Sequence, residues 1–127
     1  YEPGELCAVG YRNGQEVVRE THRTAKEPDH LEVSCIYQGT QHQLFAVKVV
    51  DCDGNLCPHS CVPVTFHVEG GKICGVGNGD PACHEPDVSD RRTTFNGLAL
   101  CITEHMEEEM LVCARAEDLQ SGECHIR

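Results

Sequence analysis

The sequence has no tryptophan and few other aromatic residues, with three phenylalanines and three tyrosines among its 127 residues. Aromatic side chains are the largest core fillers, so a core here must be built mainly from Val, Leu, Ile, Ala and Cys. No apolar run approaches the roughly 20 residues that a membrane-spanning helix needs. A sustained helical period is missing too, which argues against an α-helical fold.

Positive charge is scarce, because 10 Lys and Arg stand against 21 Asp and Glu and give a net charge of -11. Such a chain repels nucleic acid and anionic lipid, and we expect neither as a partner. The length allows one domain, or one domain plus a fragment. Because the chain begins at Tyr1, without a starting Met or a signal peptide, we expect it to be part of a longer protein.

The ten cysteines allow two interpretations. In a small secreted chain they would indicate a disulfide framework. Cys35, Cys101 and Cys113 instead lie inside apolar runs, where a free thiol acts as a small hydrophobic side chain. Free thiols favour a cytoplasmic location, whereas disulfide bonds would place the protein in the periplasm or outside the cell.

The first part of the chain predicts a β-hairpin. Two extended runs, 6–11 and 17–22, flank Asn13-Gly14, which is the strongest short hairpin signal. A linker that contains a proline follows. A lone hairpin is marginally stable at best, so residues 1–27 are predicted to be the terminal hairpin of a preceding domain plus its linker.

Residues 28–127 are predicted to form a series of short strands. Apolar and polar residues alternate between Val62 and Glu69, which predicts a strand with one buried face, whereas 44–50 is apolar except for Lys48. The predicted strands occupy residues 31–35, 44–50, 62–68, 73–76, 98–103 and 110–116. Their spacing predicts an all-β fold, an immunoglobulin-like β-sandwich, in which 117–127 form a last strand or a tail.

The stretch 73–102 is the longest one whose features depend on one another. Glycine adopts positive φ or lets two backbones approach closely. Four glycines are therefore predicted to mark fixed backbone geometry: Gly75, Gly77, Gly79 and Gly97. Three polar side chains are expected to cap their own backbone turns, namely Asn78, Asp80 and Asn96.

Three segments together carry a family resemblance. The first is YEPGEL at residues 1–6, followed by AVGY and an Asn-Gly pair. The second is 47–58, whose DCDGN turn is followed by VTF at 64–66. The third supplies a structural loop motif that consists of Gly75, Gly77, Asn78, Gly79, Asp80, Pro81, His84, Glu85, Pro86, Phe95, Asn96 and Gly97. In this order and spacing, the segments resemble the C-terminal region of bacterial glycoside hydrolase family 2 enzymes of the β-galactosidase type.

The resemblance implies a parent enzyme with a sugar-binding domain, an immunoglobulin-like sandwich, a catalytic (β/α)8 barrel and further sandwich domains. This chain would be the end of one accessory domain, residues 1–27, and all of the next, a bacterial immunoglobulin-like or invasin-like domain at 28–127. The implied partners are neighbouring domains of the same enzyme. A homo-oligomer of the parent and contact with carbohydrate are further options.

In that family the two catalytic glutamates lie in the barrel, and one of them follows an asparagine. This sequence has no Asn-Glu pair, because its four asparagines precede Gly or Leu. We therefore expect no catalytic residue and no cofactor in this chain. Its expected role is packing between domains, assembly of the enzyme or shaping of the substrate entrance.

Catalysis within the chain is one alternative. A retaining glycosidase needs two carboxyl groups about 5 Å apart, one of them with a raised pKa. The simpler interpretation is that the acids of the long loop are solvated charges. Arg91 and Arg92 follow this loop, and we expect them to pair with Asp87 and Asp90 rather than with nucleic acid. The four acids are Asp80, Glu85, Asp87 and Asp90.

Metal binding is a second alternative. Zinc could use Cys52, Cys57, His59 and Cys61, but their single loose Cys-x3-Cys spacing lacks the paired knuckles of structural zinc sites. A Cys57–Cys61 disulfide, or unlinked thiols, would also account for them. The oxygen-rich loop 78–90 lacks the spacing of a calcium loop. We therefore expect no metal site. Cys83 and His84 are adjacent, and adjacent side chains of an extended segment point in opposite directions, so no catalytic Cys-His pair is expected either.

Two non-enzymatic alternatives are a carbohydrate-binding module and an adhesion-type immunoglobulin-like domain of a surface protein. Sugar-binding sandwich modules usually present exposed aromatic platforms. Phe45 and Phe66 lie in apolar or alternating runs and are expected to be buried. The rings that the chain offers are Tyr1, Tyr11, Tyr37, Phe45, Phe66 and Phe95.

Overall fold

A computed structural model describes residues 2–127, so Tyr1 of the first resemblance segment lies outside the described residues. The fold is all-β, as the sequence predicts. No helix in this part of the chain is long and apolar enough to cross a membrane. The strands are β1 (Glu5–Arg12), β2 (Gln15–Arg23), β3 (His30–Gln38), β4 (His42–Val50), β5 (Pro63–Glu69), β6 (Gly71–Gly77), β7 (Arg91–Thr93), β8 (Leu98–His105), β9 (Met110–Arg115) and β10 (Gly122–Ile126).

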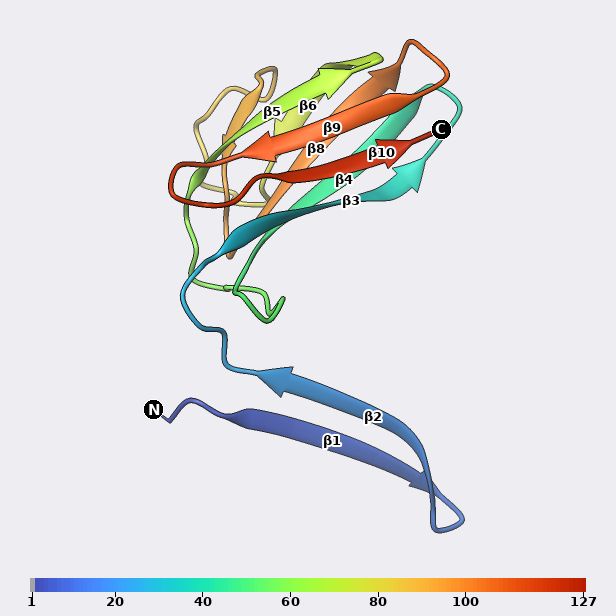
Figure 1. The fold of residues 1–127 in the computed structure, drawn as a ribbon, viewed down its shortest axis with the longest axis vertical. Coiled ribbons are helices and arrows are strands. Elements are labelled where there is room, and N and C mark those ends of the chain that lie inside the picture. The colour runs from blue at the N-terminus through green and yellow to red at the C-terminus, as the bar shows by residue number, and fades with distance from the viewer. Residues whose placement is uncertain (1) are drawn as a thin grey trace.

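β1 and β2 form a separate antiparallel sheet at the lower end of the molecule in Figure 1. Asn13 and Gly14 connect them with φ values of 52° and 77°, the two positive angles of a type I′ hairpin turn. All of β2 is exposed, and so are apolar side chains such as Leu6. The predicted hairpin is therefore present, and it contributes nothing to the hydrophobic core.

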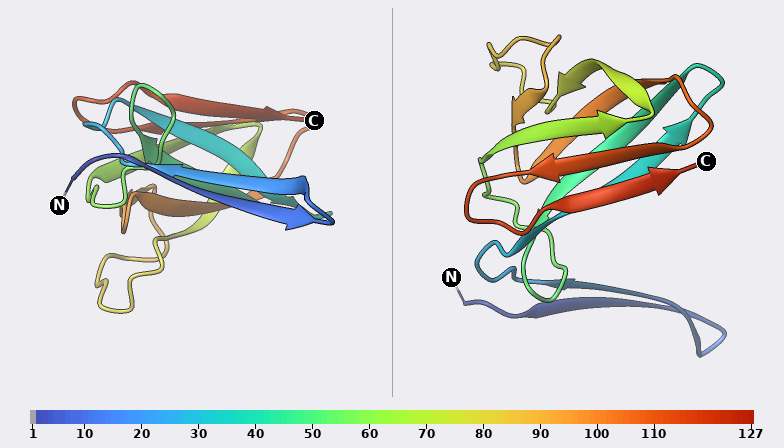
Figure 2. Two further views of the ribbon diagram at one scale, coloured as in Figure 1. Left: turned by 90° about the horizontal axis from the view of Figure 1, so that it is seen from below. Right: turned by 45° about the horizontal axis from the view of Figure 1, so that its top comes forward.

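The other strands form two four-stranded sheets, β3-β4-β8-β6 and β10-β9-β5-β7, which pack face to face (Figures 1 and 2). The first order matches the A-B-E-D sheet of a constant-type immunoglobulin domain, and β10-β9-β5 matches its G-F-C sheet. The chain changes sheet at every connection from β4 to β9. This topology confirms the predicted immunoglobulin-like β-sandwich.

Alternate residues of the strands fill the space between the sheets. On β4 the side chains of Phe45, Val47 and Val49 are fully buried, and Val64 and Phe66 of β5 belong to the same cluster. The two predicted buried phenylalanines are confirmed. The remaining core is aliphatic or sulfur-containing, as the composition predicts: Leu31, Cys57, Val76, Ala99, Cys101, Met110, Val112 and Ala114.

All ten cysteines carry free thiols in this structure. Cys101 is buried in the core, whereas Cys35 and Cys113 are only half-buried in their strands. Removal from water raises the pKa of each of these three thiols, and that of Cys101 reaches about 12. A raised pKa keeps a thiol protonated and unreactive. Cys101 and Cys35 act as packing residues of the core, whereas Cys113 lies outside it.

The structure contains one strand that the sequence does not predict, and it settles one open alternative. The unpredicted strand is β7, whose three residues are polar and lie inside the expected long loop. It pairs with β5, where Arg92 lies opposite Val64. The open choice at 117–127 is resolved by β10, which pairs with β9 as a last strand.

Candidate functional site

The loop motif runs from β6 to β8 and projects from the sandwich as the yellow loop of Figure 2. Its first turns are held by their own side chains. The Asp80 amide donates to Asn78 Oδ1 at 3.0 Å, and the Ala82 amide donates to Asp80 Oδ1 at 2.9 Å. Asn78 Nδ2 also donates to the Thr93 carbonyl at 2.9 Å, which fastens the turn to β7. The predicted caps at Asn78 and Asp80 are therefore confirmed.

Arg92 organises the rest of the loop from inside. Its side chain is 3% exposed although it carries a charge. Nη2 donates to the carbonyls of Val76 and Pro86 at 3.0 and 3.1 Å. Nη2 also pairs with Asp87 Oδ1 at 2.8 Å, and Nη1 lies 2.9 Å from the Cys83 sulfur. One guanidinium thus ties the end of β6 to the returning half of the loop.

The expected pairing of two arginines with two aspartates is correct for one pair only. Arg92 pairs with Asp87, but Asp90 instead uses its backbone carbonyl to accept the Phe66 amide at 2.7 Å. Arg91 is exposed, because successive strand residues point to opposite faces and Arg92 takes the inward position. Sequence proximity could not distinguish which arginine would face inward.

Glu85 is a structural carboxylate of this loop. It accepts hydrogen bonds from the Thr93 amide at 2.8 Å and from the Thr93 hydroxyl at 2.7 Å. These bonds from Thr93 lower the pKa of Glu85, which is opposite to the raised pKa that a glycosidase acid needs. The Asp87 side chain is 89% exposed, so water is not excluded around it. The geometry therefore favours a fastening role for both carboxylates.

Two positions of the motif need their particular backbone conformation. Gly79 and Gly97 have φ values of 77° and 76°, where other residues are strained. A Cβ at Gly97 would also collide with the Cys57 carbonyl. Asn96, at φ 52°, precedes Gly97 in a type I′ turn, so its backbone angle rather than a side-chain cap explains it.

Gly75 and Gly77 lie inside β6 and need no positive φ. A Cβ at Gly75 would be 3.4 Å from the Asp87 carbonyl, so this glycine allows the loop to approach the strand. A Cβ at Gly77 would meet nothing within 4 Å. The prediction of a local constraint at Gly77 is therefore wrong, because the side of the strand that its Cβ would occupy is open.

The remaining members of the motif are exposed along the loop: Pro81, His84, Pro86 and Phe95. Among residues 2–127, Phe95, Tyr11 of β1 and Tyr37 of β3 are the exposed rings. These three aromatic residues belong to separate segments of the fold.

A second constellation lies where the DCDGN turn meets the linker. Asp51 is fully buried, and its Oδ1 accepts hydrogen bonds from the Asp53 and Asn55 amides at 2.9 and 2.8 Å. Its Oδ2 accepts the Lys26 amide of the linker at 2.9 Å and Asn55 Nδ2 at 3.1 Å. One carboxylate therefore holds both the turn and the chain that enters the sandwich.

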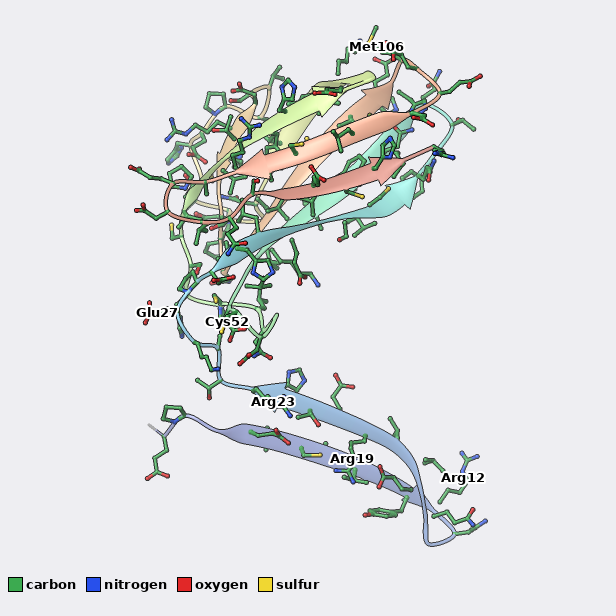
Figure 3. The ribbon with its side chains drawn as sticks, in the orientation of Figure 1. Arg12, Arg19, Arg23, Glu27, Cys52 and Met106 are labelled. Atoms are coloured by element: carbon green, nitrogen blue, oxygen red, sulfur yellow. The ribbon has the colours of Figure 1, made fainter. Side chains whose placement is uncertain are left out.

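Asp51 fixes the linker electrostatically as well as geometrically. Its hydrogen bonds, with that from the Lys26 amide foremost, hold the pKa of Asp51 well below its usual range. The Lys26 ammonium pairs with Asp53 at 2.6 Å. Figure 3 shows Glu27 and Cys52 beside this junction, above Arg23 of the hairpin. The linker is thus fastened to the lower end of the sandwich.

The sequence indicated the turn at Asp51 but not its contact with the linker. The signal for the turn was the Asp-Gly pair and the flanking Asn, which are typical turn residues. The bond to Lys26 joins residues 25 positions apart, and no local pattern encodes it. Asp51 is therefore the positioning residue that sequence reasoning missed.

Two open hollows lie around this junction. A cavity of about 690 Å³ lies between the start of β1, the linker and the turn, with Glu5, Arg23, Lys26 and Asp53 in its lining. Another of about 490 Å³ lies between the end of β2 and residues 54–59. Charged side chains of both signs line the larger cavity, which lies where the hairpin and the linker meet the turn of the sandwich.

Within residues 2–127, no three His, Cys, Asp or Glu side chains converge as a metal site. The thiols considered for zinc occupy different environments. Cys57 is buried and donates to the Lys26 carbonyl at 3.6 Å, whereas Cys52 and Cys61 are exposed. In both the loop motif and the Asp51 turn, the polar side chains therefore form hydrogen bonds that hold the backbone in place.

Residues 26–125 match the family described as Glycoside hydrolase family 2 C-terminal domain 5. Among curated proteins, Beta-galactosidase BoGH2A of Bacteroides ovatus is 30% identical over 111 residues. The aligned region is 83% of this chain and 13% of that protein. The chain therefore spans a small part of the relative that it matches.

Solved structures share the fold over the whole chain. A β-glycosidase from Bacteroides vulgatus superposes with a TM-score of 0.90 at 21% identity, over 100% of this chain and 18% of that one. A glycosyl hydrolase family 2 member from Bacteroides cellulosilyticus gives 0.86 at 27% identity, over 100% and 19%. The likeness therefore includes the hairpin and the linker as well as the sandwich.

Proposed function

The chain belongs to the C-terminal domain 5 family of glycoside hydrolase family 2, and we propose that it serves a β-galactosidase-type enzyme as a non-catalytic accessory domain. The match over residues 26–125, which include all of β3 to β9 and most of β10, carries this proposal. The parent polypeptide would hydrolyse β-galactosides or related glycosides with residues outside this chain. The lowered pKa of Glu85 supports a structural role for the loop.

We further propose that residues 1–27 complete a preceding accessory domain and that 28–127 form the next. The exposed apolar side chains of the hairpin support this division, because Leu6, Val17 and Val18 have no core of their own. The neighbouring domains of the parent are then the main partners. A homo-oligomer of the parent and contact with carbohydrate are compatible with the same role.

The charge and the thiols support two further parts of the proposal. A net charge of -11 disfavours nucleic acid and anionic membranes as partners. Ten free thiols suit a cytoplasmic protein, since reducing conditions keep cysteines unpaired. Thiol counting on the purified protein under non-reducing conditions tests the location, and disulfides would place it in the periplasm or outside the cell.

The test of the accessory role compares the 127-residue chain with the complete polypeptide that contains it. The chain alone is expected to be β-rich by circular dichroism and to leave a nitrophenyl β-galactoside intact. The complete polypeptide is expected to hydrolyse it. Turnover by the chain alone that disappears in Glu85→Gln or Asp80→Asn would overturn the non-catalytic role.

A further inference from the structure

The two sheets of the sandwich differ on the side that faces away from the core. On β4 and β8, which are the central strands of their sheet, the outward residues alternate with the buried ones. Leu44 of β4 lies opposite Ile102 of β8, and Ala46 lies opposite Leu100. Neither partner of these cross-strand pairs is polar. The outside of this sheet is therefore apolar along its centre, where a solvated face would carry polar residues.

The apolar surface continues to both ends of the central strands. Tyr37 of β3 lies opposite Leu44 and is 59% exposed, and Leu98 at the start of β8 is 38% exposed. We name this surface the apolar face, made of Tyr37, Leu44, Ala46, Leu98, Leu100 and Ile102. Charged residues surround it, among them Glu32 opposite Lys48 and the Lys72–Glu104 pair at 2.6 Å. An apolar centre with a polar rim is typical of an interaction surface.

The outside of the other sheet is built differently. The two apolar outward residues of β9, Leu111 and Cys113, are each flanked by polar neighbours. Cys113 lies between His67 and Glu123, and Leu111 lies between Glu69 and His125. We name this surface the polar face, made of Thr65, His67, Glu69, Arg91, Arg115, Glu123 and His125. It is the pattern expected of a sheet that faces water.

Gly77 of β6 lies at the edge of the apolar face, and this position explains why a glycine is present. It lies opposite Leu100 on β6, and no atom of the described chain would touch a Cβ at this position. A glycine at an open strand position costs stability unless another surface approaches it. Gly77 keeps the edge of the apolar face flat, which allows a neighbouring backbone or side chain to lie close.

We propose that in the complete protein the apolar face is covered by another domain of the same polypeptide, through a matching apolar surface. This inference rests on the proposed accessory role. The chain corresponds to only 13% of its Bacteroides ovatus relative, so most of such a polypeptide lies outside the matched region. A second copy of this chain is the less suitable occupant, because two bodies of net charge -11 repel each other.

The linker anchor is consistent with such docking. Because Asp51 fastens the Lys26 amide to the sandwich, the chain before it leaves in one direction. A fixed exit reduces the conformational entropy that is lost when a preceding domain and its neighbours settle on the apolar face. Interfaces between domains of one chain typically bury about 600–1,500 Å², which one face of a four-stranded sheet can supply.

Hydroxyl-radical footprinting read by mass spectrometry tests the proposal on the complete polypeptide and on the 127-residue chain. Side chains of the apolar face, namely Tyr37, Leu98, Leu100 and Ile102, should be modified severalfold less in the complete polypeptide than in the chain. On the polar face, His67 and His125 provide the matched control and should be modified equally in both.

A pair of variants separates docking from folding. Ile102→Glu places a charge on the apolar face, and His67→Glu places one at an outward position of a central strand on the polar face. Both chains alone should keep their melting temperature, but only Ile102→Glu should restore the modification of Tyr37 in the complete polypeptide. Ile102→Thr, a milder β-branched change, serves if Ile102→Glu fails to fold.

Two outcomes would overturn the proposal. Equal modification of the apolar face in both proteins would show that it is free in the complete protein. Protection that is already present in the chain alone and is lost on dilution would assign the face to a second copy. Protection without β-galactoside hydrolysis by the complete polypeptide would support the docking and refute the proposed function. Hydrolysis without protection would support the proposed function and refute the docking.

Discussion

The two outer faces of this sandwich both belong to four-stranded antiparallel sheets, yet they have opposite chemistry. On the polar face each apolar residue of β9 lies between polar cross-strand neighbours. On the apolar face Leu44 and Ala46 lie opposite Ile102 and Leu100. An isolated sandwich needs only its inner faces to be apolar. This difference is the basis of our proposal that the apolar face is the contact surface of the domain.

The largest expected effect separates the inside of the sheet from its apolar face. Phe45→Ala, which removes a fully buried ring, should lower the free energy of unfolding of the chain by about 3–5 kcal/mol. Leu44→Ala, one residue away on the outer side, should cost about 1 kcal/mol or less, because Leu44 is only half-buried. Urea denaturation of both variants measures this. Similar losses would mean that the apolar face is a covered core even in the chain alone.

The two glycines of the motif provide the next comparison. Gly97→Ala forces a side chain into positive φ and against the Cys57 carbonyl, so we expect a loss of about 2–3 kcal/mol in the free energy of unfolding. Gly77→Ala places a methyl group in open space and should leave the free energy of unfolding unchanged or raise it by up to about 1 kcal/mol. Chemical denaturation distinguishes them, and a costly Gly77→Ala would contradict the open face.

The linker anchor should give a smaller effect that depends on pH. Asp51→Asn keeps the shape but weakens the bonds to the Lys26, Asp53 and Asn55 amides, and we expect the melting temperature at neutral pH to fall by about 5 °C. The matched control is Asp53→Asn, whose carboxylate is exposed and should change the melting temperature little.

The sign of the pH effect follows from the depressed pKa of Asp51. Its carboxylate contributes fully above the unfolded pKa of about 4, and the contribution is lost as the pH falls from there toward the lower folded pKa. The free energy of unfolding of Asp51→Asn should therefore vary less than that of the parent chain below about pH 4. Equal slopes in acid denaturation would contradict the anchor.

The smallest effect is expected on the polar face. Thr65→Val adds an apolar side chain next to Arg91 and Arg115, its register partners. The free energy of unfolding of the chain should change by no more than about 0.5 kcal/mol, and footprinting of the complete polypeptide should be unchanged. Protection of this face in the complete polypeptide would remove the distinction between the two surfaces.

Much of the loop motif followed from local rules, and its exceptions have physical causes. The caps at Asn78 and Asp80 bond to amides two residues ahead, so sequence alone indicates them. The inward position of Arg92 was not predicted, because a charged residue is rarely buried. Nη2 offsets the burial by donating to the Val76 and Pro86 carbonyls and to Asp87, although Nε is buried without a hydrogen-bond partner among the described residues.

The sequence by itself determined most of the strands, the Asn13-Gly14 hairpin turn and the family resemblance, because a two-residue period and a type I′ turn are local properties. It also indicated that residues 44–50 are apolar apart from Lys48. Only the tertiary structure decided that Leu44 and Ala46 meet Ile102 and Leu100, and that Asp51 binds the linker. These contacts join residues far apart in the chain, and the register of a sheet is set by how the whole sandwich packs.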